Sequence, residues 1–259
     1  MGGPRPGGPT PPRENQVGCS GQYSSTWTTR DYTLQDLDTP FHAAVSGAFG
    51  SACLEAGVQV AQLEACLNAV WPDLWARFLG GSLAPDRLRL EWFQRALPAA
   101  GVHLDDGDVR RLAERYEDAF EGNLRLYPDV FPALTALRQV RPELRFGLVT
   151  NGPSVRQRKR AAALGIDGWF DVWVISEEIG SAKPDRRVFE TALAYAHAHP
   201  AEAVMVGDDP RTDVAGAKGA GVRALWVNRK RLEWPKEVGV DPDGASPDLL
   251  GIVALLRDL

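Results

Sequence analysis

Residues 203–217 form the stretch with the strongest consequences for the fold. A short run of strand-favouring apolar residues ends at Gly207, and two aspartates follow at once. This pattern predicts a buried strand, an acidic turn and a helix that begins near Asp213. Ligands of open α/β sheets bind at the carboxyl ends of the strands. Asp208 and Asp213 are therefore expected to form an oxygen-rich pocket suited to a hard divalent cation, most simply Mg²⁺. The alternative is an acidic turn in which Asp213 merely caps a helix.

The second half of the chain alternates between strand patterns and helix patterns. Predicted strands cover residues 145–150, 172–176, 203–207 and 222–227, and predicted helices cover residues 130–137, 154–164, 213–221 and the stretch from Ser246 onward. This alternation predicts an α/β fold with a doubly wound, Rossmann-like parallel sheet. Gly216, Gly219 and Gly221 lie within or after a predicted helix, so they do not indicate a dinucleotide-binding loop between a strand and a helix.

The first half of the chain has a different organisation. Residues 1–30 are rich in Gly, Pro, Ser, Thr and Arg, which predicts a disordered tail. Residues 42–126 carry apolar and aromatic side chains at helical spacing, broken at Gly80 and Gly81, which predicts a helical bundle cap. The α/β core is then expected to comprise residues 31–41 and 127–259.

Composition and charge exclude several classes of protein. The net charge of −5 provides no basic field for a nucleic acid polymer. The three cysteines form no CxxC pair, which fits a reducing, cytoplasmic location. Neither a membrane-spanning apolar stretch nor the apolar core of a signal peptide occurs in the sequence. We expect a cytoplasmic monomer or homodimer with a small-molecule partner and no membrane partner.

Chemically suited side chains follow the predicted strands. They are Asp36 and Asp38, Thr150 and Asn151, Lys183, and Asp208 with Asp213. A carboxylate can attack phosphorus, a lysine and Mg²⁺ can offset the charge, and hydroxyl and amide groups can bind phosphoryl oxygens. A second carboxylic acid can protonate the leaving oxygen. Read separately, Lys183 could be an exposed lysine and residues 150–152 a plain turn; read together, they predict a phosphoryl-transfer site.

Three motifs carry a resemblance to a known family. They are Leu148-Val149-Thr150-Asn151-Gly152, Ser181-Ala182-Lys183-Pro184-Asp185 and Val206-Gly207-Asp208-Asp209 with Asp213. With these motifs the chain resembles the haloacid dehalogenase-like (HAD) hydrolases, and residues 174–184 resemble the pyrimidine nucleotide 5′-monophosphatase branch of that family.

The resemblance implies a role for each candidate residue. Asp36 would be the nucleophile, Asp38 the general acid and base, and Lys183 the charge partner, with Thr150 and Asn151 binding the phosphoryl group. Asp36, the Asp38 carbonyl and Asp208 would bind Mg²⁺, and Asp213 would support them. The implied function is Mg²⁺-dependent hydrolysis of a small phosphorylated metabolite, with a nucleoside 5′-monophosphate favoured, through an aspartyl-phosphate.

The first motif departs from the family pattern. Residues 31–35, expected as the strand before the nucleophile, are polar, and Pro40 stands where the family has Thr or Val four residues after the nucleophile. Alternatively, Thr39 is that threonine, one position early. A shifted reading frame or a wrong start before about Asp36 would account for the unusual tail and for the polar strand. Two further alternatives are a 2-haloacid dehalogenase of the same family and a non-catalytic protein with a degraded first motif. A signalling receiver domain is disfavoured, because a long helical stretch separates Asp36 and Asp38 from the other groups.

Overall fold

The computed structural model describes residues 24–29 and 31–258. Its main sheet has six strands in the order β5-β4-β1-β6-β7-β8, and all pairs of neighbouring strands are parallel. The strands are β1 (Ser25–Thr28), β4 (Arg145–Thr150), β5 (Val172–Ile175), β6 (Ala203–Gly207), β7 (Arg223–Val227) and β8 (Gly244–Ser246). The predicted α/β class with a doubly wound, Rossmann-like parallel sheet is therefore confirmed.

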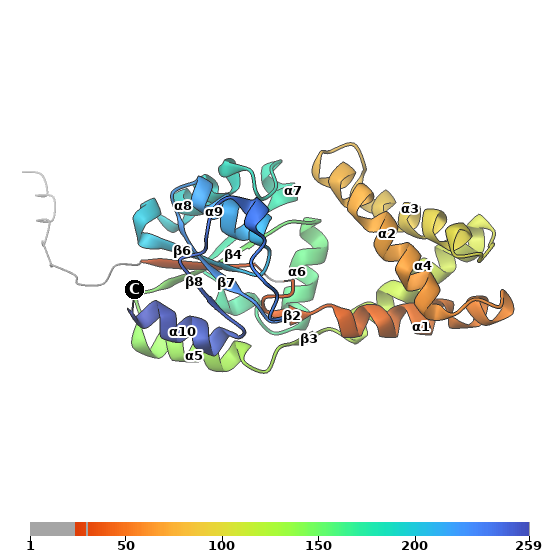
Figure 1. Ribbon diagram of the computed structural model, residues 1–259, viewed down its shortest axis with the longest axis horizontal. Coiled ribbons are helices and arrows are strands. Elements are labelled where there is room, and N and C mark those ends of the chain that lie inside the picture. Colours follow the sequence, from red (N-terminus) through yellow and green to blue (C-terminus); the bar gives the residue numbers. More distant parts are fainter. Residues whose placement is uncertain (1–23, 30, 259) are drawn as a thin grey trace, which may run out of the picture.

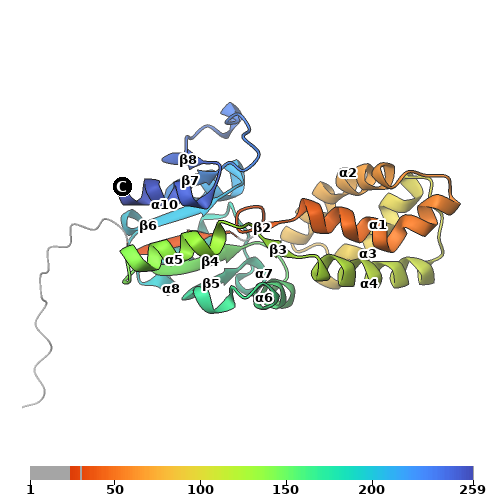
Figure 2. The same ribbon diagram turned by 90° about the horizontal axis from the view of Figure 1, so that it is seen from below.

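Helices cover both faces of this sheet (Figures 1 and 2). They are α5 (Val130–Val140), α6 (Ser154–Ala163), α7 (Ser176–Ile179), α8 (Arg186–Ala196), α9 (Gly216–Gly219) and α10 (Leu249–Asp258). One apolar cluster joins α5 and α10 to one face, and a second joins α8 and α9 to the other. A sheet covered on both faces presents its carboxyl edge as the open place for a ligand.

The predicted boundaries in the core hold closely. The structure reproduces the predicted strands 145–150 and 203–207 without change and places the other two within one residue. The helix predicted over residues 213–221 differs, because a π-helical turn at Pro210–Ala215 precedes the short α9. In this turn the Asp209 side chain accepts hydrogen bonds from the N–H groups of Arg211 and Thr212. Asp209, rather than Asp213, is therefore the residue that caps this segment.

The amino-terminal strand departs from prediction. Ser25–Thr28 lies in the expected tail, yet it forms β1 in the middle of the sheet, paired with β4 on one side and β6 on the other. The strand expected over residues 31–35 is instead a turn that leads into β2 (Gln35–Asp36). The polar composition of β1 hid it, because central parallel strands are normally apolar runs. The remainder of the predicted tail, residues 1–23 and 30, lies outside the described residues.

The interior position of β1 leaves polar atoms without partners. Among the described residues, Ser25 Oγ, Thr26 Oγ1 and Trp27 Nε1 are buried and have no hydrogen-bond partner. The Trp27 side chain is fully buried against β4, where a Cβ at Gly147 would lie 2.5 Å from Trp27 Cδ1. Gly147 thus makes the room that this tryptophan occupies, while the three unpartnered atoms are a destabilising feature of the central strand.

A separate helical part stands at one end of the sheet (Figures 1 and 2). It consists of α1 (Asp38–Glu55), α2 (Val60–Leu79), α3 (Pro85–Ala99) and α4 (Asp106–Gly122). The antiparallel pair β2 and β3 (Arg125–Leu126) joins it to the core. We call these four helices the cap. No helix among the described residues has the length and apolarity needed to cross a membrane.

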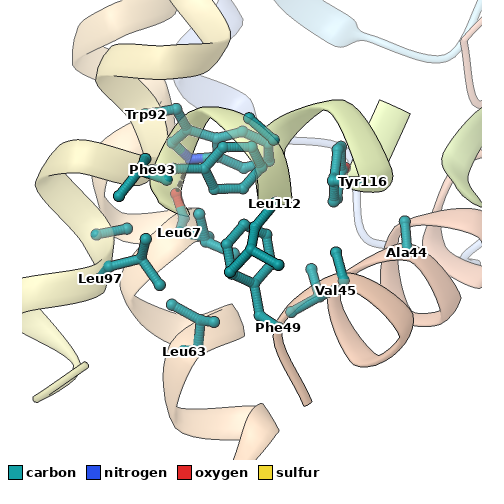
Figure 3. Packing of buried hydrophobic residues seen from close by; sticks show 14 of the residues in the cluster. Ala44, Val45, Phe49, Leu63, Leu67, Trp92, Phe93, Leu97, Leu112 and Tyr116 are labelled. Carbon is teal, nitrogen blue, oxygen red and sulfur yellow. Dashed lines mark hydrogen bonds between the residues drawn. The ribbon is translucent and has the colours of Figure 1, made fainter. Parts of the chain in front are cut away.

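The cap has an aromatic interior of its own (Figure 3). Phe49 and Phe93 pack with ring centroids 4.7 Å apart, and Phe93 meets Tyr116 at 5.1 Å. The indole N–H of Trp92 donates to the carbonyl oxygen of Leu67 at 2.7 Å, as the dashed line in Figure 3 marks. The N–H of a buried tryptophan usually has such a partner, and this contact joins α3 to α2.

Candidate functional site

A buried ion pair lies just beyond the carboxyl edge of the sheet. Lys183 Nζ donates to Asp213 Oδ1 at 2.6 Å, and both side chains are almost fully buried, with exposed fractions of 3% and 2%. The other carboxylate oxygen of Asp213 accepts the Asp209 N–H at 3.1 Å. Lys183 is therefore not an exposed lysine. Its ammonium has three donors, and the contact with Asp213 uses one of them.

Asp208 follows β6 and faces the loop after β1. Its Oδ1 accepts a hydrogen bond from the Thr33 hydroxyl at 2.8 Å, across 175 residues of sequence. Burial, and then the nearby Asp213 carboxylate, raise the pKa of Asp208 to about 8. The carbonyl of Thr33 accepts from Arg229 Nη2 at 2.6 Å, so the Thr33 loop is fixed from two sides. A carboxylate in such a setting is stabilised in its charged form by a nearby cation.

Thr150 and Asn151 end β4 at the same edge. The hydroxyl of Thr150 is buried and makes one long contact, 3.4 Å, with the Asn151 carbonyl. The Asn151 side chain donates to the Lys183 carbonyl at 3.0 Å and accepts the Lys183 N–H at 2.9 Å. Both polar atoms of that side chain thus hold the Lys183 loop in place, whereas the Thr150 hydroxyl retains capacity to bind a ligand oxygen.

Asp36 and Asp38 do not follow a strand of the main sheet. Asp36 pairs with Arg125 in the β2–β3 connection, and its Oδ1 accepts the backbone N–H of Asp38 at 3.0 Å. Asp38 begins α1, where its carboxylate accepts from the Tyr32 hydroxyl at 2.9 Å and pairs with Lys230 at 3.0 Å. The expectation that Asp36 follows the central strand is therefore wrong. The DxD spacing was present, but the strand that reaches the edge ends eight residues earlier, at Thr28.

The residues that do follow the central strand are Thr29 and Asp31. The family pattern has an acidic pair two residues apart and a threonine four residues after its first member. With Thr33 as that threonine, the first position is Thr29 and the second is Asp31. Thr29 continues the strand, because its N–H donates to the Val206 carbonyl at 3.3 Å. The spacing of two residues from Asp31 to Thr33 in the sequence indicates this register of the first motif. It is hard to recognise because Thr29 stands where the pattern has its first aspartate.

A pocket separates the cap from this edge of the core. Its volume is about 230 Å³, and its lining includes Asp31 and Tyr32 after β1 together with side chains of α2, α3, α4 and α6. Asp38 also contributes to the lining, whereas Asp36 does not. Burial and then the Asp38 carboxylate raise the pKa of Tyr32 above its ordinary value. Asp31 is thus the carboxylate that both follows β1 and faces a cavity.

The donor set restricts how a metal could be bound. Within the described part of the chain, no three His, Cys, Asp or Glu side chains converge on one point. Of the four expected ligands, Asp213 is engaged by Lys183, Asp38 pairs with Lys230, and Oδ1 of Asp36 accepts the N–H of Asp38 at the start of α1. Asp208 remains at the edge. Mg²⁺ is commonly held by one or two carboxylates with water and substrate oxygens in the other positions, and the single carboxylate of Asp208 at this edge fits that pattern.

Sequence comparisons relate this chain to known phosphatases. The family model described as haloacid dehalogenase-like hydrolase matches residues 32–221. A phosphoserine phosphatase of Thermus thermophilus is 38% identical over 197 residues, which cover 72% of this chain and 72% of that protein. The pyrimidine 5′-nucleotidase YjjG of Escherichia coli is 36% identical over 175 residues, covering 66% and 73%. The family match begins after Thr29 and Asp31, so it leaves the end of β1 outside the similarity.

Solved structures agree on the fold. The HAD hydrolase YfnB of Bacillus subtilis, bound to magnesium, superposes with a TM-score of 0.72 at 22% identity and covers 91% of this chain and 99% of its own. A 2-haloacid dehalogenase of Pseudomonas syringae pv. tomato has a TM-score of 0.63 at 26% identity and covers 92% and 100%. The expected resemblance is confirmed: this chain belongs to the haloacid dehalogenase-like hydrolase family, the family of enzymes that includes these phosphatases.

Proposed function

We propose that this chain binds a small phosphomonoester at the carboxyl edge of the sheet and hydrolyses it, with a nucleoside 5′-monophosphate as the favoured substrate. The observation that carries the proposal is the position of four side chains at that edge in a member of this family. Thr150 ends β4, Asp208 follows β6, Asp31 follows β1, and the Lys183 loop is hydrogen-bonded to Asn151 after β4. The similarity to a phosphoserine phosphatase and to a pyrimidine nucleotidase supports the substrate class.

In this proposal each core residue has a separate role in the reaction. Lys183 offsets the charge of the phosphoryl group, and the Thr150 hydroxyl donates to one of its oxygens. Asp31 takes a proton from a water molecule, the water oxygen bonds to phosphorus, and the bond from phosphorus to the leaving oxygen breaks. Asp31 then gives that proton to the leaving oxygen, which is released as an alcohol, and the Asp31 carboxylate is restored.

Mg²⁺ belongs to the proposal as the expected cofactor. Asp208 and backbone oxygens at the end of β1 would hold it, and it would supply electrostatic stabilisation of the phosphoryl oxygens. The magnesium-bound structure of YfnB supports this assignment. An aspartyl-phosphate on Asp36 is not part of the proposal, because Asp36 caps α1.

The test compares Asp31 with Asp36. The present proposal requires the Asp31 carboxylate for hydrolysis, whereas the aspartyl-phosphate hypothesis requires that of Asp36. Hydrolysis of p-nitrophenyl phosphate is measured with and without Mg²⁺ for the wild-type chain, Asp31→Asn and Asp36→Asn. We expect metal-dependent turnover that falls by about 10²-fold or more in Asp31→Asn, the scale of a positioned acid or base, and that persists in Asp36→Asn. Loss in Asp36→Asn with activity kept in Asp31→Asn would overturn the assignment.

A second candidate is a phosphate-binding protein without turnover. Thr29 favours it, because a threonine stands at the first position of the acidic pair, where the family pattern has the nucleophilic aspartate. This candidate predicts that the wild-type chain binds uridine 5′-monophosphate in a calorimeter but releases neither phosphate from it nor chloride from a 2-haloacid. Chloride release would instead identify the dehalogenase alternative.

A further inference from the structure

The pocket between cap and core contains a cluster of three arginines that surround the carboxylate of Glu117. Arg89 of α3 pairs with Glu117 Oε1 at 2.6 Å, and Arg156 of α6 approaches the same oxygen at 3.3 Å. Arg160 of α6 lies 3.7 Å from the other oxygen of Glu117. Arg89, Arg156 and Arg160 all line the pocket. Arg89 and Arg156 alone place two positive charges on one carboxylate.

This sharing has an electrostatic consequence. Although burial would raise the pKa of Glu117, Arg89, Arg156 and Arg160 outweigh it and hold that pKa below its ordinary value. Burial, and then the like charge of Arg89, lower the pKa of Arg156. An anion entering the pocket would relieve this repulsion between guanidinium groups, and charge-assisted hydrogen bonds to such an anion are strong.

Aromatic rings hold the arginine at the cap side. The guanidinium of Arg89 lies 5.0 Å from the ring centroids of both Trp92 and Tyr116. Trp71 and Trp75, half-buried on α2, stack with centroids 5.3 Å apart and also line the pocket. Arg89 is therefore oriented before any ligand arrives, so little conformational entropy is lost when it binds one.

The pocket lining combines groups from the core and from the cap. Asp31 follows β1 at the proposed phosphoryl site, Arg156 belongs to α6 of the core, and Arg89 belongs to α3 of the cap. The Asp38 carboxylate in the same lining is already paired with Lys230. A ligand that spans the pocket would thus place its phosphoryl group at the core edge and its remaining part among Arg89, Arg156 and the tryptophans.

We infer that Arg89 and Arg156 bind a second acidic group, a carboxylate, on the leaving-group part of the phosphomonoester. The substrate class is then a phosphomonoester that carries a carboxylate beyond the ester oxygen. Among the favoured nucleoside 5′-monophosphates, it is one whose base carries a carboxylate. This inference rests on the proposed function in one respect, since it takes the phosphoryl group to lie at the core edge. It does not require turnover.

Two pairs of ligands that differ in one carboxylate provide the test. They are orotidine 5′-monophosphate against uridine 5′-monophosphate, and O-phosphoserine against O-phosphoethanolamine. Dissociation constants are measured by calorimetry with Mg²⁺ present, on the wild-type chain and on Asp31→Asn. We expect the carboxylated member of at least one pair to bind about tenfold tighter or better, the scale of a charge-assisted hydrogen bond.

Variants on both sides of the pocket identify the residues responsible. Arg89→Gln and Arg156→Gln should each reduce the preference for the carboxylated ligand, whereas Arg87→Gln, an exposed arginine on the same helix as Arg89, should leave it unchanged. Glu117→Gln should increase the preference, because it removes the shared counter-charge. If the arginine cluster had only a structural role, Glu117→Gln would weaken the binding of both ligands in a pair. A larger preference for the carboxylated ligand in this variant therefore indicates that the arginines contact the ligand.

The outcomes distinguish this inference from the proposed function. If both ligand pairs bind equally to the wild-type chain, or if the preference survives in Arg89→Gln and in Arg156→Gln, the inference is wrong. If the preference is present but no ligand is hydrolysed, the inference stands and the proposed hydrolysis fails. If the ligands are hydrolysed but the carboxylated members bind no tighter, the proposed hydrolysis stands and the inference about Arg89 and Arg156 is wrong.

Discussion

The ammonium of Lys183 and the carboxylate of Asp213 lie 2.6 Å apart in the interior, joined by a hydrogen bond across 30 residues of sequence. Breaking a buried pair by removing one partner leaves an uncompensated charge, which costs about 3–5 kcal/mol. Lys183→Met and Asp213→Asn should each lower the free energy of unfolding by about this amount, as measured by urea denaturation.

The double variant Lys183→Met with Asp213→Asn completes the cycle. Because it buries neither charge, it should lose less stability than the sum of the two single variants. Additive losses would mean that the two groups do not stabilise each other, despite the short contact.

Thr29 offers a gain-of-function test of the site. If Thr29 occupies the nucleophile position, Thr29→Asp restores the acidic pair with Asp31 and should raise phosphatase turnover by about 10²-fold or more. Thr29→Asn is the matched control, because it has the same shape without the charge. Equal activities of Thr29→Asp and Thr29→Asn would contradict this register of the first motif.

The unpartnered hydroxyl in β1 predicts a stabilising substitution. Thr26 Oγ1 is buried without a hydrogen-bond partner, next to Leu137 and Phe146. Thr26→Val keeps the shape and removes the polar group, so it should raise the free energy of unfolding by about 1–2 kcal/mol. Thr33→Val, which removes the hydrogen bond to Asp208, should lower it instead. A loss of stability in both variants would show that Thr26 has a partner in solution.

Asp208 predicts the dependence on Mg²⁺. Magnesium that binds the folded chain should raise its melting temperature with the logarithm of the ligand excess, and EDTA should reverse the shift. Asp208→Asn should abolish the response to magnesium, whereas Asp36→Asn should retain it. A response that depends on Asp36 and not on Asp208 would place the metal at the start of α1.

The gene itself carries a further test. Residues Ser25–Thr29 can be encoded by TCG ACC TGG ACT AC, preceded by T. When the reading frame starts one nucleotide earlier, at the preceding T, the same bases encode Phe-Asp-Leu-Asp-Tyr. This peptide contains an acidic pair two residues apart, and its last two residues, Asp-Tyr, are the same as Asp31-Tyr32. We predict that the gene contains a short duplication, not a multiple of three nucleotides, before the codon for Asp31. Sequencing the gene checks this, and other codons at these positions would contradict it.

Much of the core could be predicted, because its signals are local. The apolar runs that end at Thr150 and at Gly207 coincide with β4 and β6, since each run is long enough and bounded by turn residues. Parallel strands bring their carboxyl ends together, so Thr150, Lys183, Asp208 and Asp213 were expected at one edge, and they lie there. The loop position of Lys183 was also right, although its buried partner Asp213 had been expected only to support a metal.

The start of the chain could not be predicted from the same signals. The sequence was sufficient for the family, the α/β class and the residues after β4 and β6, because those depend on local apolar runs and on motif spacing. Only the folded chain shows that Ser25–Thr28 is a central strand, that Asp36 lies at the start of α1 and that Asp31 faces the pocket. The physical reason is that β4 and β6 impose strand pairing on β1 through hydrogen bonds across more than 100 residues, and such non-local contacts override local propensity.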